Sequence, residues 1–244
     1  MASRGLSTDA LTAITEFLHG AIELILHSRR VYPPEIFEQR RLFDVALPHS
    51  RAPELNEYIA YLVHGARELM ERGECDALVV SILGRPRDAF PSVQPTLLER
   101  FRIDLRLPPF DSNAVGPDGD ALRGSLRGFL LKLHVCDALL APLPDADLSF
   151  AAELHTRSTS SSAPLPAVLR EKWCETDVTK EELDDARGAA RGGPPGGNLP
   201  MGDAVGTGFP HGAPEPYVLP LKSLDMGGIA MGLSVAAATP PPKR

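Results

Sequence analysis

The residue types that most often carry out chemistry are dispersed along this chain. Four histidines stand far apart in the sequence: His49, His64, His134 and His155. None of them belongs to an HxxxH or HxxEH pattern, so their spacing does not predict a metal site. Carboxylates are paired at 181–182 and 184–185, but that stretch is charged and of low complexity. Such a stretch is typical of a solvated face rather than of acid–base catalysis.

Motifs for phosphate binding and for covalent catalysis do not occur either. No P-loop or GxGxxG follows a predicted strand, because the glycines at 192–197 have no helical pattern behind them. No GxSxG is present, and no nucleophile is spaced to meet a base. The three cysteines, Cys75, Cys136 and Cys174, form no CxxC, which favours a reducing compartment. We expect a protein that is not an enzyme and that holds neither a metal nor a cofactor.

Two side chains are unusual for their surroundings. Trp173 is the only tryptophan and lies in the C-terminal part of the chain, where it either pins that part to the body or anchors a partner. Arg127 lies in the middle of the most apolar helical pattern. It is either a snorkelling or ion-paired arginine, which is the usual case, or a contact to a partner.

The longest helical pattern spans 118–140. Its first apolar face recurs at spacings of four and three residues: Leu122, Leu126, Phe129, Leu133, Cys136 and Leu140. A second apolar face holds Leu131, Val135 and Leu139, and a thin polar stripe lies between the two. A helix that is apolar on two sides is typical of the middle of a fold, so we expect this helix to be covered from two directions.

A first helix is predicted at 9–29. Asp9 is a plausible N-cap, and the prolines of VYPP end the helix. The chain that follows, 36–47, reads as irregular with a short strand around 42–47.

A second helix is predicted at 53–72. Pro53 suits its first position and Gly73 its C-terminal stop. Tyr58 lies on the shoulder of the apolar stripe of this helix rather than at its centre.

Strand patterns fill most of the remaining chain. Residues 77–83 are apolar and β-branched, as in a strand buried on both faces, and 84–87 reads as a turn. Residues 100–107 alternate charged and apolar side chains, as in a strand with one wet face, after a loop at 91–98. Further strands are predicted at 148–155, 167–173, 217–224 and 229–237. The sequence thus predicts an α+β fold, with three helices on one face of a mainly antiparallel sheet.

Composition limits the possible partners. The 244 residues carry a net charge of −7 and no large basic cluster, which argues against direct binding to nucleic acid. The N-terminus has no signal-peptide pattern and no apolar run reaches the length of a bilayer, so we expect a soluble protein without a membrane partner. Many of the 24 prolines and 21 glycines cluster in 190–216, which predicts a long, loosely held insertion.

Five short motifs occur in a defined order along the chain. They are VYPPEIF at 31–37, PELNEYI at 53–59, FLLKLHVCDALL at 129–140, HTR at 155–157 and PLK at 220–222. Together they resemble the HORMA-domain accessory subunits of translesion DNA polymerase zeta, the mitotic-arrest-deficient 2-like proteins. The resemblance covers roughly residues 8–235 and agrees with the predicted order of elements.

The resemblance implies a division of the chain into a HORMA domain at 8–237 and a tail at 238–244. The domain would have a core at 8–156 and a C-terminal safety belt at 157–237. A Gly- and Pro-rich insertion at about 185–213 is additional to the family pattern. We expect it to be a solvent loop, since loop length adds little to the entropy of closure.

Proteins of this family are adaptors, and the resemblance implies how this chain would act. The belt would wrap over a proline-containing peptide of the polymerase's catalytic subunit and hold it against the sheet by strand addition. Tyr58 and Trp173 match aromatic residues that pack on that peptide. Arg127 matches an arginine of the HORMA–HORMA interface, in homo- or heterodimers, and Ala138 lies on the same surface.

A second partner face is implied on the strands of the belt, for the scaffold polymerase of translesion synthesis. Its positions align with Val218, Pro220, Gly232 and Ser234. Val218 keeps an apolar side chain, whereas Gly232 and Ser234 stand where familiar members have polar and aromatic residues. Since aromatic residues often anchor interfaces, we expect this contact to be weaker or to use other residues.

The expected protein is therefore a nuclear adaptor of polymerase zeta, with the cytoplasm as a second location and an AAA+ ATPase as the remodelling partner of the belt. One alternative is a spindle-checkpoint or meiotic HORMA adaptor with a different client. Another, from a different class, is a hydrolase with an unrecognised site. A hydrolase would need perturbed titratable groups clustered in one cleft.

Overall fold

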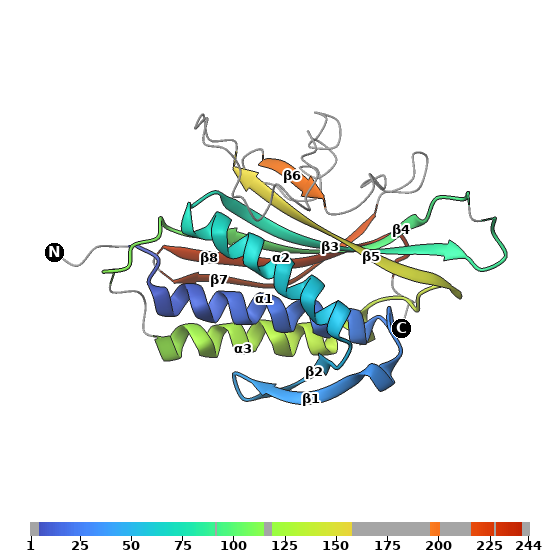
Figure 1. Cartoon of the computed structure of the whole chain (residues 1–244), viewed down its shortest axis with the longest axis horizontal. Coiled ribbons are helices and arrows are strands. Elements are labelled where there is room, and N and C mark those ends of the chain that lie inside the picture. The colour runs from blue at the N-terminus through green and yellow to red at the C-terminus, as the bar shows by residue number, and fades with distance from the viewer. Residues whose placement is uncertain are drawn as a thin grey trace.

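Helix α1 (Thr8–Ser28) lies at the centre of the core. The computed structural model describes residues 5–90, 92–114, 119–157, 196–200, 216–226 and 228–240. Within this part of the chain, α1 is buried along almost its whole length, from Ala10 to Leu26. Helices α2 (Pro53–Glu71) and α3 (Gly119–Cys136) pack against it (Figure 1). By length and composition α1 could cross a membrane, contrary to our expectation, but most of it is buried as in a soluble core helix.

The two ends of the first helices show how local sequence sets their limits. Ser7 caps α1, because its hydroxyl accepts a hydrogen bond from the Ala10 amide at 3.3 Å. Our assignment of the cap to Asp9 was wrong: Asp9 lies in the first turn, where the helix dipole favours a negative charge. Helix α2 begins on Pro53 and ends before Gly73, whose φ of 70° suits a glycine stop, as expected.

Helix α3 is present where expected and packs against both α1 and β7, but its second apolar face is not covered. It ends at Cys136 and continues as a short 3-10 turn, η2 (Asp137–Leu139). Its first apolar face is buried against α1. The second face is exposed, with exposed fractions of 47% for Leu131, 52% for Val135 and 41% for Leu139. Helix α1 is more fully enclosed than α3, because its apolar residues surround the helix instead of forming two separate stripes.

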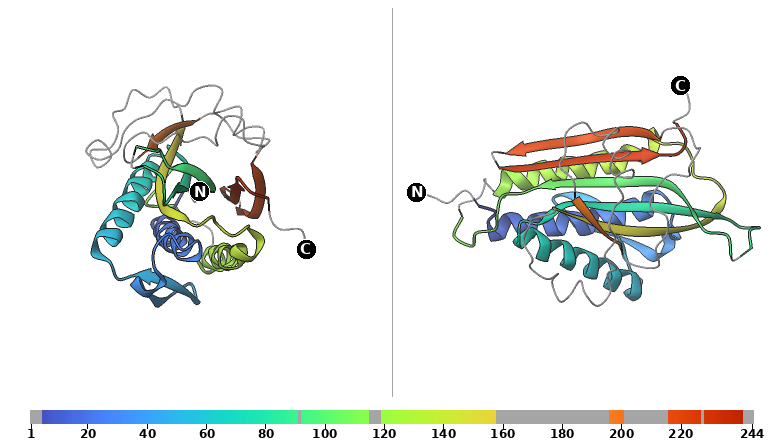
Figure 2. Two further views of the ribbon diagram at one scale, coloured as in Figure 1. Left: turned by 90° about the vertical axis from the view of Figure 1, so that its right-hand side faces the viewer. Right: turned by 90° about the horizontal axis from the view of Figure 1, so that it is seen from above.

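A six-stranded antiparallel sheet covers one side of the three helices (Figures 1 and 2). Its order is β6-β5-β3-β4-β8-β7, so strands distant in sequence are neighbours. The strands are β3 (Cys75–Pro86), β4 (Thr96–Arg106), β5 (Ala146–Arg157), β6 (Gly196–Pro200), β7 (Tyr217–Met226) and β8 (Ile229–Ala237). The expected α+β architecture, with helices on one face of a mainly antiparallel sheet, is confirmed.

Burial along the strands follows the sequence patterns. Strand β3 is buried on both faces, whereas β4 and β8 alternate buried and less buried side chains. The turn expected at 84–87 is wrong, because β3 continues to Pro86 and pairs there with Ala146 of β5. A proline at the end of a strand removes one donor without interrupting the inner ladder.

A β-hairpin lies on the opposite side of the helices from the sheet (Figure 1). It joins β1 (Phe37–Leu42) to β2 (Val45–Ser50) and follows a 3-10 turn, η1 (Pro34–Ile36). We had expected irregular chain with a short strand around 42–47, which overlaps β2, but not β1 or the turn between the two strands. The two turn residues, Phe43 and Asp44, have φ angles of 48° and 60°. Two left-handed residues make a tight hairpin turn, but neither residue is a glycine or asparagine that would have revealed it.

Arg29 joins the end of α1 to the sheet and to the end of α3. Its guanidinium donates to both carboxylate oxygens of Glu99 on β4, at 2.8 and 2.6 Å, and to the Ala141 carbonyl at 2.8 Å. It also pairs with Asp137 of η2. Burial alone would lower the pKa of Arg29, but Glu99 and Asp137 outweigh it and raise the pKa. Arg29 therefore stays charged inside the protein.

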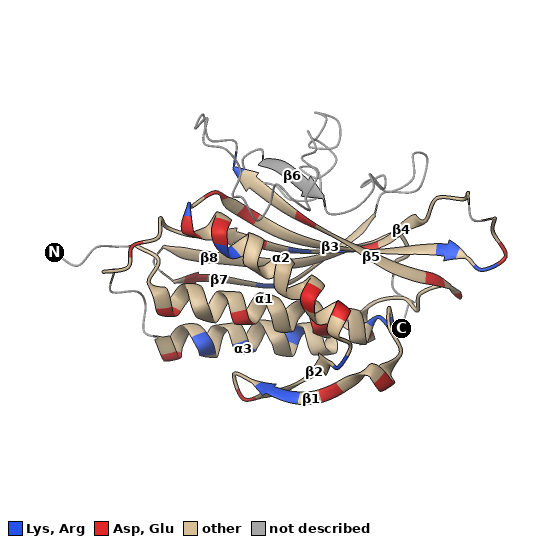
Figure 3. Cartoon of the chain, in the orientation of Figure 1, with Lys and Arg blue, Asp and Glu red and all other residues tan. Residues whose placement is uncertain are grey.

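Charged side chains are mixed over the surface. In the view of Figure 3, basic and acidic residues alternate along the helices and the hairpin, without a broad basic area. Exposed pairs such as Arg40 with Glu38 and Arg67 with Glu71 neutralise one another. In this view, the described residues form no basic surface of the kind that phosphate binding needs.

Candidate partner-binding sites

Among the described residues, one edge of the sheet is only partly paired. Strand β5 pairs with β3 along its length, but on its other side β6 pairs with residues 153–157 only. Within the described chain, 146–152 have no strand on that side. An edge of this kind can take up an extended peptide through main-chain hydrogen bonds.

Strand β6 itself was not expected. It lies inside the insertion that we had interpreted as a solvent loop, and its backbone pairs antiparallel with the end of β5. Its sequence, GGNLP, carries no strand pattern, since glycine and proline are depleted in strands. Hydrogen bonds to the edge of β5 stabilise this strand, although its own residues do not favour strand formation.

An aromatic cluster lies beside the open part of β5. Phe150 of β5 meets the ring of Tyr58 of α2 edge-on, at 5.3 Å between centroids and 88° between planes. Tyr32 meets the same phenylalanine at 6.3 Å and 73°. All three rings are half-buried and pack against the core. Edge-to-face rings of this kind form firm apolar contacts for a bound side chain.

The hydroxyl of Tyr58 is a donor at physiological pH. Burial, and then the neighbouring Tyr32, raise the pKa of Tyr58 to about 12. The sequence predicted Tyr58 on the shoulder of α2, and it lies there. Tyr32 and Phe150 were missed as site residues, although Tyr32 belongs to the VYPP motif and Phe150 to a predicted strand. Trp173, the other expected peptide contact, lies outside the described residues, as does the strand expected at 167–173.

A second candidate surface is the outer face of α3. Leu131, Val135 and Leu139 follow one another at spacings of four, so they form one exposed apolar stripe. Arg127 lies four residues before Leu131, and Ala138 three residues after Val135; both are exposed. The helix geometry therefore brings the two predicted interface residues onto the same face as the stripe. Exposed apolar groups gathered in this way are typical of an interaction site.

A third candidate surface lies on the hairpin of β7 and β8. Pro220 pairs directly with Ser234, and Val218 pairs with Ala236, two residues further along β8. Gly232 is two residues from Ser234 in the other direction. Because directly paired residues and alternate residues share a face, Val218, Pro220, Gly232 and Ser234 all lie on one side of the hairpin. That side is turned away from the helices, since Met231, Leu233 and Val235 face the core.

Strand β4 continues the third surface. Arg102 pairs with Ser234 and Asp104 with Gly232, and Arg102 Nε lies 2.7 Å from Asp104 Oδ1. A Cβ atom on Gly232 would lie 3.2 Å from Asp104 Oδ2, so a larger side chain there has to displace the carboxylate. The position of this ion pair beside Gly232 and Ser234 was missed from sequence, because the pairing of β4 with β8 joins segments about 130 residues apart.

A cluster of polar side chains from β4 and β5 surrounds the buried Glu153, with β3 lying between the two strands. Glu153 lies 3.7 Å from Arg100 and 3.4 Å from His155, and Arg102 contacts the other nitrogen of His155 at 3.2 Å. Burial would raise the pKa of Glu153, but His155 and Arg100 together lower it. Burial lowers the pKa of His155, which Glu153 only partly offsets. The carboxylate is thus charged and the imidazole neutral, which makes a balanced structural cluster at neutral pH.

The two described cysteines are poor nucleophiles. Burial raises the pKa of both the Cys75 and the Cys136 thiol to about 12. Since the thiolate is the reactive form, neither thiol is suited to attack a substrate at neutral pH.

Comparison with known proteins identifies the family. A model described as the HORMA domain matches residues 10–110. The mitotic spindle assembly checkpoint protein MAD2B of Gallus gallus is 31% identical over 176 residues, which are 71% of this chain and 79% of that protein. The chain belongs to the HORMA-domain family. The DNA polymerase zeta processivity subunit of Arabidopsis thaliana is also similar, at 31% identity over 131 residues, 54% of this chain and 56% of that protein.

Solved HORMA structures share the fold at low sequence identity. A chain of the mitotic checkpoint complex aligns with 93% of this chain and 98% of its own length, with a TM-score of 0.63 and 15% identity. HTP-2 of C. elegans, solved with a HIM-3 closure motif, aligns with 96% of this chain and 93% of its own length, with a TM-score of 0.60 and 11% identity. These likenesses confirm the expected HORMA architecture.

Proposed function

We propose that this HORMA protein is a non-catalytic adaptor subunit of translesion DNA polymerase zeta. It would trap a proline-containing peptide of the catalytic subunit beneath its C-terminal belt and link the polymerase to other damage-tolerance factors in the nucleus. The proposal is supported by relatives named as polymerase zeta processivity subunits in plants and fission yeast. The single observation that carries it is the open edge of β5 beside the Tyr32, Tyr58 and Phe150 cluster.

The chemistry of this edge suits a proline-containing strand. Main-chain groups of 146–152 can pair with an extended peptide, and this pairing accepts many sequences. Proline cannot complete the ladder at its own nitrogen, so its binding depends on contacts to its ring. The half-buried rings of Tyr58 and Phe150 offer apolar faces for such contacts. The aromatic cluster would thus select prolines that the backbone pairing alone does not select.

Binding of a catalytic-subunit peptide with spaced prolines, measured by calorimetry on the full chain, tests the proposal. Tyr58→Ala and Trp173→Ala are each expected to weaken binding by about 1–4 kcal/mol, the range of anchor residues. Tyr217→Ala is a matched control, because Tyr217 is an exposed tyrosine on β7. Failure of the native chain to bind the peptide would refute the adaptor proposal. Binding that survives both anchor substitutions would refute the anchor assignment alone.

The outer face of α3 is assigned to contact with a second HORMA protein. Its exposed stripe of Leu131, Val135 and Leu139 gives the apolar centre that such an interface needs, and Arg127 and Ala138 lie beside it. The hairpin surface around Val218 and Pro220 is assigned to the scaffold polymerase. An AAA+ ATPase would reset the belt after capture.

A spindle-checkpoint adaptor is the second candidate function. It is favoured by the relatives named MAD2B, which their names place in the mitotic spindle assembly checkpoint. A competition experiment separates the two functions. A polymerase peptide and a checkpoint-protein peptide compete for the same edge of β5, and the peptide with the lower Kd identifies which adaptor function the protein has.

A further inference from the structure

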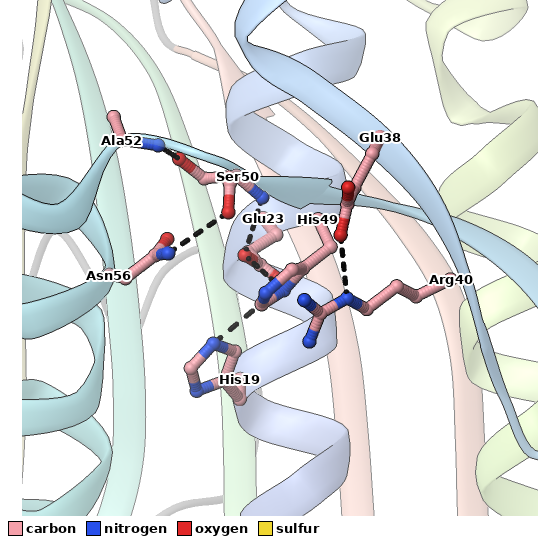
Figure 4. A network of polar contacts seen from close by, with 8 residues as sticks. All are labelled: His19, Glu23, Glu38, Arg40, His49, Ser50, Ala52 and Asn56. Atoms are coloured by element: carbon pink, nitrogen blue, oxygen red, sulfur yellow. Dashed lines mark hydrogen bonds and ion pairs between the residues drawn. The ribbon is translucent and has the colours of Figure 1, made fainter.

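Three potential metal ligands meet between α1 and the β1–β2 hairpin, although no metal site was expected from sequence. They are His19 and Glu23 of α1 and His49 of β2 (Figure 4). Glu23 is buried, with 4% of its side chain exposed, while His19 and His49 are 30% and 19% exposed. The group is distinct from the partner-binding surfaces, which lie on β5, the outer face of α3 and the β7–β8 hairpin. Its donors are two imidazoles and one carboxylate, the set typical of zinc.

The carboxylate of Glu23 contacts both histidines. Its Oε1 accepts a hydrogen bond from the Ser50 amide at 3.0 Å and also lies 3.0 Å from His49 Nδ1. Its Oε2 lies 3.1 Å from His49 Nδ1 and 3.8 Å from His19 Nε2. Four ligands around a tetrahedral zinc at about 2.0–2.1 Å are about 3.3 Å from one another. The two separations from Oε2 bracket that value, so an ion can be accommodated with small shifts of the side chains.

The nitrogen of His19 has no hydrogen-bond partner. Nε2 is shielded from solvent and lies beyond hydrogen-bonding distance of the Glu23 carboxylate. Buried polar nitrogens are normally satisfied, so an unpaired one directed at a carboxylate calls for an explanation. The rings of His19 and His49 lie 6.2 Å apart at an interplanar angle of 29°, and their candidate ligand nitrogens lie within 4.8 Å of each other. A bound cation would satisfy the orphan nitrogen.

The Ser50 amide holds the Glu23 carboxylate in place as an outer partner, which is a regular feature of metal sites.

We propose that His19, Glu23 and His49 bind one zinc ion, with water in the remaining position. Binding would fasten β2 to α1 beside the start of α2. Ser50 accepts a hydrogen bond from the Ala52 amide, and Asn56 donates to the Ser50 carbonyl. Tyr58 lies two residues beyond Asn56. The metal site and the aromatic cluster would thus share the first turns of α2, and zinc would make that region more rigid.

Zinc calorimetry on the untagged full chain, stripped of metal, tests the proposal. We expect one zinc per chain and a melting temperature raised by about 5–10 °C when zinc is 100-fold above its Kd. His19→Ala should weaken zinc binding by about 100-fold or more, beyond the loss typical of an outer partner. The absorption spectrum of the cobalt-loaded chain, which reports the coordination of the ion, should change in the same variant.

Two further variants decide the outcome. His64→Ala is the matched control, because His64 also lies four residues before a glutamate, Glu68, at 3.9 Å. Within the described chain, no third ligand comparable to His49 is brought to that pair. This variant should therefore bind zinc like the native chain. Glu23→Gln should abolish zinc binding, although the glutamine side chain can still accept the hydrogen bond from the Ser50 amide. Absence of stoichiometric binding, or equal binding by the native chain and His19→Ala, would overturn the proposal.

Discussion

Arg29 is a charged side chain inside the core, and its guanidinium meets Glu99, Asp137 and the Ala141 carbonyl together. Replacing it by methionine would leave Glu99 buried without its partner. Arg29→Met is therefore expected to lower the free energy of unfolding by about 3–5 kcal/mol, measured by urea denaturation. Removing both charges should cost much less, because a buried pair is often replaceable by apolar residues. A double variant with Glu99→Leu that is no more stable than the single variant would contradict this explanation.

The buried thiols predict how stability changes at high pH. The folded protein raises the pKa of Cys75 to about 12, from an ordinary value of 9.0. A group whose pKa is raised on folding contributes stability that is fully present below its unfolded pKa and is lost as the pH approaches the folded value. Stability should therefore fall between about pH 9 and pH 12. Urea midpoints at several pH values measure this fall, and Cys75→Ala should make it shallower; an identical slope would exclude the thiol as a cause.

Individual residues were predictable where one element determines their environment. The half-buried position of Tyr58 follows from the period of α2 alone. The neighbours of a residue were not predictable where distant segments meet. His19 and Glu23 are four residues apart on α1, which is a readable signal, but His49 comes from a hairpin whose turn the sequence did not reveal. Phe150 was likewise recognised as a strand residue but not as a neighbour of Tyr58.

Among the elements, the β1–β2 hairpin contains backbone strain that a single substitution to glycine can remove. Asp44 has a φ of 60°, which costs a non-glycine residue about 1–2 kcal/mol. Asp44→Gly removes this cost but adds about 0.4–1 kcal/mol of entropy loss on folding. We expect a net stabilisation of about 0.5–1 kcal/mol in thermal or urea unfolding. Gly228→Ala, at a φ of 133°, is the control of opposite sign and should destabilise the protein. Lower stability of Asp44→Gly would show that Asp44 makes a favourable contact in the turn.

Helices and strands were mostly placed correctly, because periodicity reports which face is apolar. Periodicity does not report what covers that face. Both faces of α3 are apolar, yet only the face holding Leu126 and Phe129 is inside the protein. The other face, with Val135, is exposed. An apolar stripe that binds another protein has the same sequence pattern as one that packs in the core. Strand β6 is the opposite case, since its pairing has no signal in its own residues.

At the scale of the whole molecule, the exposed stripe predicts self-association. If α3 contacts a second HORMA protein, Arg127→Ala should shift a dimer of the native chain towards monomer in size-exclusion chromatography with light scattering. Peptide capture should remain unchanged, because Arg127 lies on α3 and the open edge lies on β5. Arg87→Ala is a matched control, since Arg87 is an exposed arginine paired with Asp145. A dimer that Arg127→Ala does not weaken would argue against this interface.

The pairing of β4 with β8 has a consequence for the protein while it is being synthesised. Phe101 pairs with Val235, so the partner strand of β4 is synthesised about 130 residues after β4 itself. At roughly 5–20 residues per second, the chain from Arg106 to Ala237 takes on the order of ten seconds to make. During that interval the edge of β4 has no partner in its own chain and can pair with another nascent chain. Aggregation of this protein would therefore begin on the ribosome, and a chaperone that shields β4 would raise its yield.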